Sequence, residues 1–205
     1  MVYQNLMGQE KNIPVRNHEA KWEKILEMNI EEKNWKKIYG VNFESCVELS
    51  LRAFQYSILL RTVPTNKYLV RCNLVNTDKC SFCQINTESI EHLFFYCPIV
   101  RNFIFAIVDK IDAPPDIKKG IDASDFLLGN VSGSLHNSMN YLYTLIKKFV
   151  FVTKINGNNL CLKRFAKMMK HYYELENTVV LNNFGNLNKH MIKWDVLKPV
   201  FLIFD

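Results

Sequence analysis

The stretch CSFCQINTESIEHLFFYC, residues 80–97, holds three cysteines and one histidine. Their spacing is Cys80-x2-Cys83-x8-His92-x4-Cys97. Zinc prefers four tetrahedral nitrogen and sulfur ligands, and closed sets of three cysteines and one histidine are typical of structural sites. The spacing therefore predicts that Cys80, Cys83, His92 and Cys97 bind one zinc ion.

Local signals around these residues agree with a metal site. A Cys-x-x-Cys pair lets one tight turn present two thiolates, and Thr87 is the expected cap of a helix with Glu88 in its first turn and His92 about one turn further on. Pro98 disfavours helix at Cys97 and is a good first residue for the next helix. Cys97 would then stand at a helix N-terminus, where the helix dipole favours the thiolate that zinc needs.

Two alternatives apply to this stretch. The cysteines could be core thiols, but Cys80 follows a polar turn, residues 76–79, instead of standing among apolar residues at helical spacing. A catalytic zinc ion needs an open coordination position, and a set with three thiolates is complete. The neighbouring aromatic residues can stack on bases or pack in the core. Packing is the favoured role for Phe94 and Phe95, whereas both roles stay open for Phe82 and Tyr96.

Composition places the 205-residue chain among globular proteins. It is 48% hydrophobic and 22% charged, with a net charge of +6 that favours an anionic partner. The sequence shows no secretory signal and no apolar run of about eighteen residues, so we expect an intracellular protein, cytoplasmic or nuclear, without a membrane partner. In such a compartment the six cysteines suit metal binding or the core better than disulfides.

Apolar spacing predicts a mainly α fold, in which helical segments flank a small CCHC zinc knuckle and a helical subdomain follows at the C-terminus. The expected helices are two short ones within 18–39, then 43–61, a short one after Thr65 or Asn66, 98–111, 135–155, 160–175 and 187–197. Residues 112–133 are the least regular part and the expected domain boundary. The expected segments are a polar tail (1–15), an N-terminal helical segment (16–75), the CCHC segment with its following helix (76–112) and a basic C-terminal helical segment (113–205).

Basic residues are the candidates for phosphate contacts. From Phe126 to Tyr173 the chain has no acidic residue, and its lysines alternate with aromatic residues. Cations beside flat rings suit nucleic-acid binding, although a solvated helix surface over a buried aromatic stripe would give the same sequence pattern. The candidates are Arg61, Lys67, Lys147, Lys148, Lys163, Arg164, Lys167 and Lys170. Arg61 could instead cap the end of its own helix.

The chain resembles the zinc-binding region that follows the polymerase in non-LTR retrotransposon reverse transcriptases. The residues that carry the resemblance are Arg61, PTNK at 64–67, CSFC at 80–83, ESI at 88–90, HLF at 92–94 and Cys97. Weaker similarity, in KWEKIL, NWKKIY, DFLLG and KHMIKW, extends it from about Lys21 to Trp194. The resemblance implies a segment that grips RNA or single-stranded DNA, with a reverse transcriptase polymerase domain as a possible protein partner.

Enzymatic activity is not expected. The polymerase of this family uses adjacent aspartates, and the sequence contains no such pair. Pro115-Asp116 is similar to the first motif of a nuclease found in related elements, but no separate Asp/Glu-x-Lys element follows, so a helix-start turn is the better interpretation. We therefore expect a non-catalytic, zinc-stabilised nucleic-acid-binding protein. The alternatives are a zinc-stabilised protein-interaction module and an element-derived fragment without nucleic-acid binding.

Overall fold

The computed structural model describes residues 17–129, 135–182 and 186–202, so the expected polar tail, 1–15, lies outside the described residues. Within those ranges the regular elements are helices, and the one β-type pairing is an isolated bridge between Lys79 and Thr87. The expected mainly α class is therefore confirmed. The elements are α1 (Asn17–Leu26), α2 (Glu32–Ser45), α3 (Leu49–Leu59), α4 (Asn66–Arg71), η2 (His92–Tyr96), α5 (Pro98–Val108), α6 (Pro115–Lys119), α7 (Ala123–Leu128), α8 (His136–Ile155), α9 (Leu162–Leu181), α10 (Leu187–Leu197) and α11 (Pro199–Leu202).

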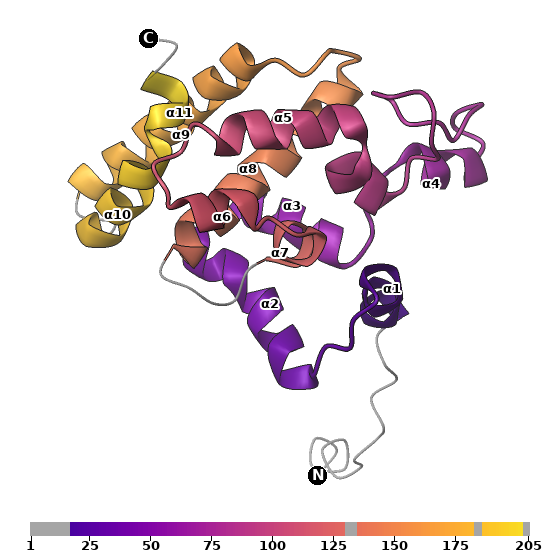
Figure 1. Cartoon of the computed structure of the whole chain (residues 1–205), viewed down its shortest axis with the longest axis horizontal. Helices are drawn as coiled ribbons and strands as arrows, with labels where there is room; N and C mark the ends of the chain where they lie inside the picture. Colours follow the sequence, from indigo (N-terminus) through magenta and orange to yellow (C-terminus); the bar gives the residue numbers. More distant parts are fainter. Residues whose placement is uncertain (1–16, 130–134, 183–185, 203–205) are drawn as a thin grey trace, which may run out of the picture.

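Helix α8 is the centre of the fold. It contacts α2, α3, α7, α9 and α10, and Figure 1 shows it running behind α5 through the middle of the molecule. Every residue from Ser138 to Val150 is buried except Lys148. A helix surrounded by other helices must be largely apolar on all sides, which accounts for the run YLYTLI at 141–146 followed by Phe149 and Val150 in this segment.

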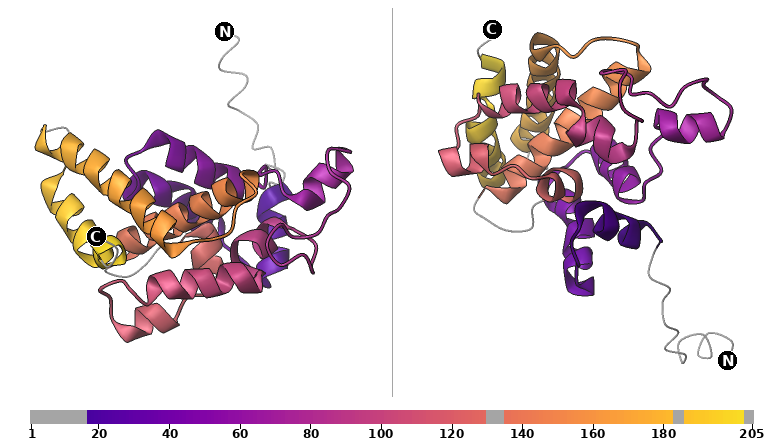
Figure 2. Two further views of the ribbon diagram at one scale, coloured as in Figure 1. Left: turned by 90° about the horizontal axis from the view of Figure 1, so that it is seen from above. Right: turned by 45° about the vertical axis from the view of Figure 1, so that its right-hand side comes forward.

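Helices α9, α10 and α11 gather on one side of the molecule, with α4 on the opposite side (Figures 1 and 2). Trp194 of α10 is fully buried and lies edge-on to Tyr141 of α8 and Tyr173 of α9. The expected helix 160–175 continues to Leu181. Its extension carries Glu176, whose buried carboxylate accepts hydrogen bonds from Lys193 and Trp194 of α10.

Helix α5 connects the cysteine-rich segment to the C-terminal helices. The Phe103 ring stacks on Phe149 of α8 at 5.5 Å and meets Phe165 of α9 at 5.9 Å. One hydrophobic cluster extends from Trp22 to Phe201. The expected segments thus share a core, and their division at 75/76 and 112/113 stays a prediction.

The expected helix 43–61 was wrong, because the chain breaks between α2 and α3. The Cys46 backbone is extended, and Arg52 donates hydrogen bonds to the carbonyl oxygens of Cys46 and Phe43. These bonds satisfy acceptors that the end of α2 leaves open. The break buries Cys46 and leaves Phe43 and Val47 62% and 61% exposed, whereas in a continuous helix 43–61 they would lie on the same face as the buried Leu51.

The segment 112–133 was expected to be irregular, which was wrong over its described part, whereas a domain boundary there stays a prediction. It contains α6 and α7, and Phe126 and Leu127 are fully buried. The Phe126 ring contacts Phe95 of η2 and Tyr143 of α8, so the segment belongs to the core. Pro115 begins α6, as the helix-start interpretation of Pro115-Asp116 requires.

Candidate metal centre

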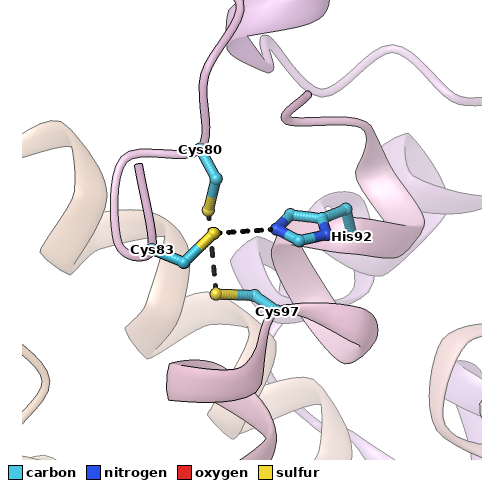
Figure 3. Close-up of side chains that lie close together, drawn as sticks. All are labelled: Cys80, Cys83, His92 and Cys97. Atoms are coloured by element: carbon cyan, nitrogen blue, oxygen red, sulfur yellow. Dashed lines mark hydrogen bonds between the residues drawn. The ribbon is translucent and has the colours of Figure 1, made fainter. Parts of the chain in front are cut away.

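The four predicted ligands meet at one point. The nitrogen or sulfur atoms of Cys80, Cys83, His92 and Cys97 all lie within 4.8 Å of one another (Figure 3). The Sγ atoms of Cys80 and Cys97 are 3.7 Å apart, and Cys83 Sγ is 3.4 Å from His92 Nε2. A tetrahedral zinc ion with zinc–sulfur bonds of about 2.3 Å separates two sulfurs by roughly 3.8 Å and a sulfur from a nitrogen by roughly 3.6 Å. The geometry and the donor set therefore fit zinc.

The first two cysteines are presented by a tight turn. Lys79 and Thr87 pair across the base of the turn, and Cys80 N–H donates to the Asn86 carbonyl at 2.8 Å. The Gln84 N–H donates back to the Cys80 carbonyl, and Gln84 adopts a left-handed backbone with φ of 57°. This chain reversal directs both thiols to the same side, as the Cys-x-x-Cys spacing predicts.

His92 is the first residue of a π-helix, η2, and Cys97 follows its last residue; the sequence pattern had not predicted this element. The Cys97 N–H donates to the His92 carbonyl at 2.8 Å, an i to i+5 bond. In an α-helix two residues five apart point about 140° away from each other, because each residue advances about 100°. The wider π-turn reduces that angle and turns both side chains toward the metal position. The five-residue spacing of two candidate ligands was the available sequence signal, and π-turns are frequent at functional sites.

The expected helix cap at Thr87 was wrong. Thr87 Oγ1 instead donates to the Asp78 carboxylate at 2.8 Å, and Ser89 Oγ accepts from the His92 N–H at 3.2 Å. The bridge to Lys79 holds Thr87 in extended backbone, so the helix begins later. Glu88 consequently precedes the helix and does not lie in its first turn.

Cys97 occupies the N-cap of α5 and Pro98 its first position, as predicted. The hydrogen bond from the Cys80 thiol is the main cause that lowers the pKa of Cys97 to about 5, and the backbone N–H groups of Val100 and Ile99 act in the same direction. The same bond, together with burial, raises the pKa of Cys80. Cys80 and Cys97 are fully buried, so the site is closed on that side.

Glu88 is the residue near the site that sequence reasoning missed. Its carboxylate is fully buried, and its partners are Ser81 in the Cys-x-x-Cys turn, the first N–H of α4 and Lys154 of α8. Burial opposes ionisation, but hydrogen bonds from Lys154 and Ser81 keep the pKa of Glu88 below its usual value. A glutamate between polar residues gave no sequence signal for a buried role.

One of the predicted phosphate contacts is corrected, and a second has structural partners. Lys147 is 1% exposed, and its ammonium donates to the Phe126 carbonyl at 2.7 Å, so it cannot reach a phosphate. Arg61 donates to Glu91 at 2.8 Å and stacks on the Trp22 ring, with its side chain 16% exposed. Its guanidinium therefore has a structural role in an ion pair. The alternative role at the end of its own helix is also seen, in the backbone: Arg61 has φ of 59°, its N–H donates to the Ile58 carbonyl, and the Thr62 N–H donates to the Ser57 carbonyl, the pattern of a left-handed C-terminal cap.

Lys67 and Lys148 keep more access to solvent. Lys67 is exposed on α4. Lys148 is half-buried, with its ammonium 4.9 Å from the centre of the Phe54 ring.

The other four predicted contacts share one face. Lys163, Arg164, Lys167 and Lys170 of α9 line a surface groove of about 690 Å³, together with Ala166, His171, Glu174 and Phe201. Lys163, Arg164 and Lys167 are exposed. Residues three or four apart lie on one face of a helix, so helical spacing places these side chains together.

The neighbouring aromatic residues divide between core and surface. Phe94 and Phe95 are buried, in agreement with the favoured packing role. Phe82 is partly buried against the core, whereas Tyr96 is 44% exposed. Of these four rings, Tyr96 is therefore the one that a base could reach most easily.

Fold and site together define a helical protein with a Cys3His metal-binding segment. A sequence model of the family described as zinc-binding in reverse transcriptase matches residues 17–103. This match confirms the resemblance for that segment, which contains all four predicted ligands, while residues from 104 onward lie outside it. Comparisons with curated proteins and with solved structures gave no match. Within the described ranges no helix is both long and apolar enough to cross a membrane.

Proposed function

We propose that this chain is a zinc-stabilised, non-catalytic nucleic-acid-binding protein related to the post-polymerase region of non-LTR reverse transcriptases. Cys80, Cys83, His92 and Cys97 hold zinc, which stabilises the segment between them. RNA or single-stranded DNA is the expected partner. The match at 17–103 and the four-ligand geometry support the zinc role.

The observation that carries nucleic-acid binding is the groove on α9. Four cationic side chains, those of Lys163, Arg164, Lys167 and Lys170, line one groove of a protein whose net charge is +6. Cations that neutralise phosphates release counterions, so binding weakens as salt rises. The groove offers charges and no array of base-reading amides, which favours contacts to phosphates with little sequence preference.

The salt dependence of binding tests this proposal. If four phosphates are neutralised, the logarithm of the binding constant falls with the logarithm of salt with a slope of about −2.8 for a single strand, or roughly 50-fold between 50 and 200 mM. Fluorescence anisotropy with labelled RNA and single-stranded DNA measures this slope. Affinity that barely changes with salt would refute the electrostatic account.

Charge reversal locates the contact. Replacing Lys163, Arg164 and Lys167 with glutamate should abolish measurable binding. Reversing Lys21, Lys24 and Lys37, which are exposed on α1 and α2, changes the net charge by the same amount and should have a much smaller effect. Equal losses in both variants would show that net charge, and not the groove, drives binding.

A second function, a zinc-stabilised protein-interaction module, is favoured by a different surface. Phe43, Val47 and Leu49, at the α2–α3 connection, are 62%, 61% and 75% exposed. Phe43 and Val47 line a cavity of about 160 Å³ together with Val179 and Val180 of α9. Exposed apolar groups that gather beside a cavity are typical of protein contacts. A polymerase domain would then bind the chain equally well after charge reversal on α9.

A further inference from the structure

Glu88 joins three parts of the molecule through one carboxylate. Oε2 accepts hydrogen bonds from the backbone N–H and the hydroxyl of Ser81, each at 2.7 Å. Oε1 accepts from the Asn66 N–H at 2.8 Å and from the Lys154 ammonium at 2.7 Å. The carboxylate is fully buried, so these partners take the place of water.

Each partner belongs to a different element. Ser81 lies between Cys80 and Cys83, so its two hydrogen bonds fix the turn that presents both thiols. Asn66 is the first residue of α4, where the helix leaves N–H groups without intrahelical partners. Lys154 lies in the last turn of α8 and also donates to the Pro64 carbonyl at 2.9 Å.

The Glu88–Lys154 pair crosses from the family-matched segment to the helices beyond it. Lys154 has a side chain that is 7% exposed, and Glu88 has 0%. A buried ion left without its partner is strongly unfavourable, so each holds the other in place. From α8 the chain runs through residues 156–161 into α9, where Arg164 donates to the Asn159 carbonyl. The anchored end of α8 therefore leads directly to the basic groove.

We propose that Glu88 is a positioning residue of the zinc centre, and that its pair with Lys154 couples zinc binding to the order of the α8–α9 connection. This inference rests on the zinc binding proposed above and adds a link to the C-terminal helices. Without Glu88 the Cys-x-x-Cys turn loses two hydrogen bonds. Its thiols are then less ordered in the metal-free protein, and zinc binding must order them, which weakens the affinity for zinc. Groups that orient metal ligands typically change metal affinity 10- to 100-fold when removed.

Glu88→Gln tests the inference, with Glu91→Gln as the matched control. Glu91 is a second largely buried carboxylate in the same segment, but its side-chain partners are Arg61 and Ser89 and not the cysteine turn. Competition with a chromophoric chelator measures zinc affinity, after circular dichroism has confirmed the helical fold. We expect Glu88→Gln to bind zinc at least 10-fold more weakly and Glu91→Gln to stay within about threefold of wild type. Equal affinities for Glu88→Gln and wild type, or equal losses in both variants, would overturn the inference.

A double variant keeps the test valid if the single change prevents folding. Glu88→Gln/Lys154→Met removes both charges, so no unpaired ion is buried. We expect it to fold and still to bind zinc at least 10-fold more weakly, because one amide oxygen replaces two carboxylate oxygens at Ser81 and Asn66. Wild-type affinity in this variant would contradict the positioning role.

Hydrogen exchange measured by mass spectrometry tests the coupling to α8. Zinc should slow amide exchange in residues 150–161 of the wild type, and Lys154→Met should remove most of that effect. If zinc protects this segment equally in both proteins, the coupling is refuted. A wild type that takes up no zinc would refute the proposed metal centre itself, whereas a zinc-loaded wild type with unaffected variants refutes only the inference about Glu88.

Discussion

Lys147 gives a prediction that separates a structural lysine from a phosphate contact. Its ammonium is buried inside the helix cluster and donates to the carbonyl oxygens of Phe126 and Leu127 at 2.7 and 3.4 Å. Burial lowers the pKa of Lys147 to about 7. An unfolded lysine has a pKa of about 10.4, so between pH 7 and 10 the unfolded chain binds more protons than the native one at this position.

Stability must therefore rise with pH over that window. A pKa that falls from about 10.4 to about 7 on folding costs roughly 4 kcal/mol at pH 7 and roughly 2 kcal/mol at pH 9. Lys147→Met removes this cost but takes the hydrogen bond from the buried Phe126 carbonyl, which costs about 1–3 kcal/mol. The Leu127 carbonyl keeps its bond from Gln55 at 2.8 Å. We expect the variant to be more stable than wild type by about 1–3 kcal/mol at pH 7, and this advantage to shrink by about 2 kcal/mol at pH 9.

Urea denaturation followed by tryptophan fluorescence at pH 7, 8 and 9 measures these differences, and comparison with wild type cancels the pH dependence of the other groups. Affinity for RNA should be unchanged, because Lys147 cannot reach a bound strand. A variant that is less stable at pH 7, with the same pH dependence as wild type, would refute the assignment of a buried lysine with a lowered pKa. Weaker RNA binding by a folded variant would refute the structural role assigned to this side chain.

Three further predictions concern the metal, the aromatic residues and one glycine. Chelation of zinc should lower the midpoint of thermal unfolding, and one equivalent of zinc should restore it. Free zinc at 100 times its dissociation constant adds about 2.7 kcal/mol to the free energy of unfolding. An unchanged midpoint would contradict zinc stabilisation. Phe94→Ala should lower the free energy of unfolding in urea by about 3–5 kcal/mol, because the ring is fully buried. Tyr96 is 44% exposed, so Tyr96→Ala should cost much less. Comparable losses in the two variants would contradict the assigned packing. Gly129→Ala should cost more than about 1 kcal/mol, since φ is 107° and the new Cβ would lie 3.1 Å from Val41, and an unchanged thermal midpoint would contradict this.

The parts of the molecule that sequence reasoning found are those specified by local spacing. Four ligands within residues 80–97 and a proline after the last one identify the metal centre and the start of α5 together. The basic face of α9 follows from helical geometry alone, because residues three or four apart lie on one side. Neither conclusion needs knowledge of which helices lie next to each other.

The parts that it missed depend on contacts between distant residues. Lys147 and Lys148 are adjacent in the sequence, yet one is inside the core and the other at its edge, and only the packing around α8 decides between them. Arg52 ends α2 from a position on α3, which no pattern within α2 encodes.

Glu88 shows the same limit at the candidate site. It resembles a first-turn acid of the helix that follows, and that role needs only local chemistry. Its actual partners include Asn66 upstream and Lys154 downstream, so its role depends on contacts that form only when the three segments pack together. If zinc orders the turn that contains Ser81, the same carboxylate transmits that order to α8, and the metal centre then stabilises helices whose sequence lies outside the matched family segment.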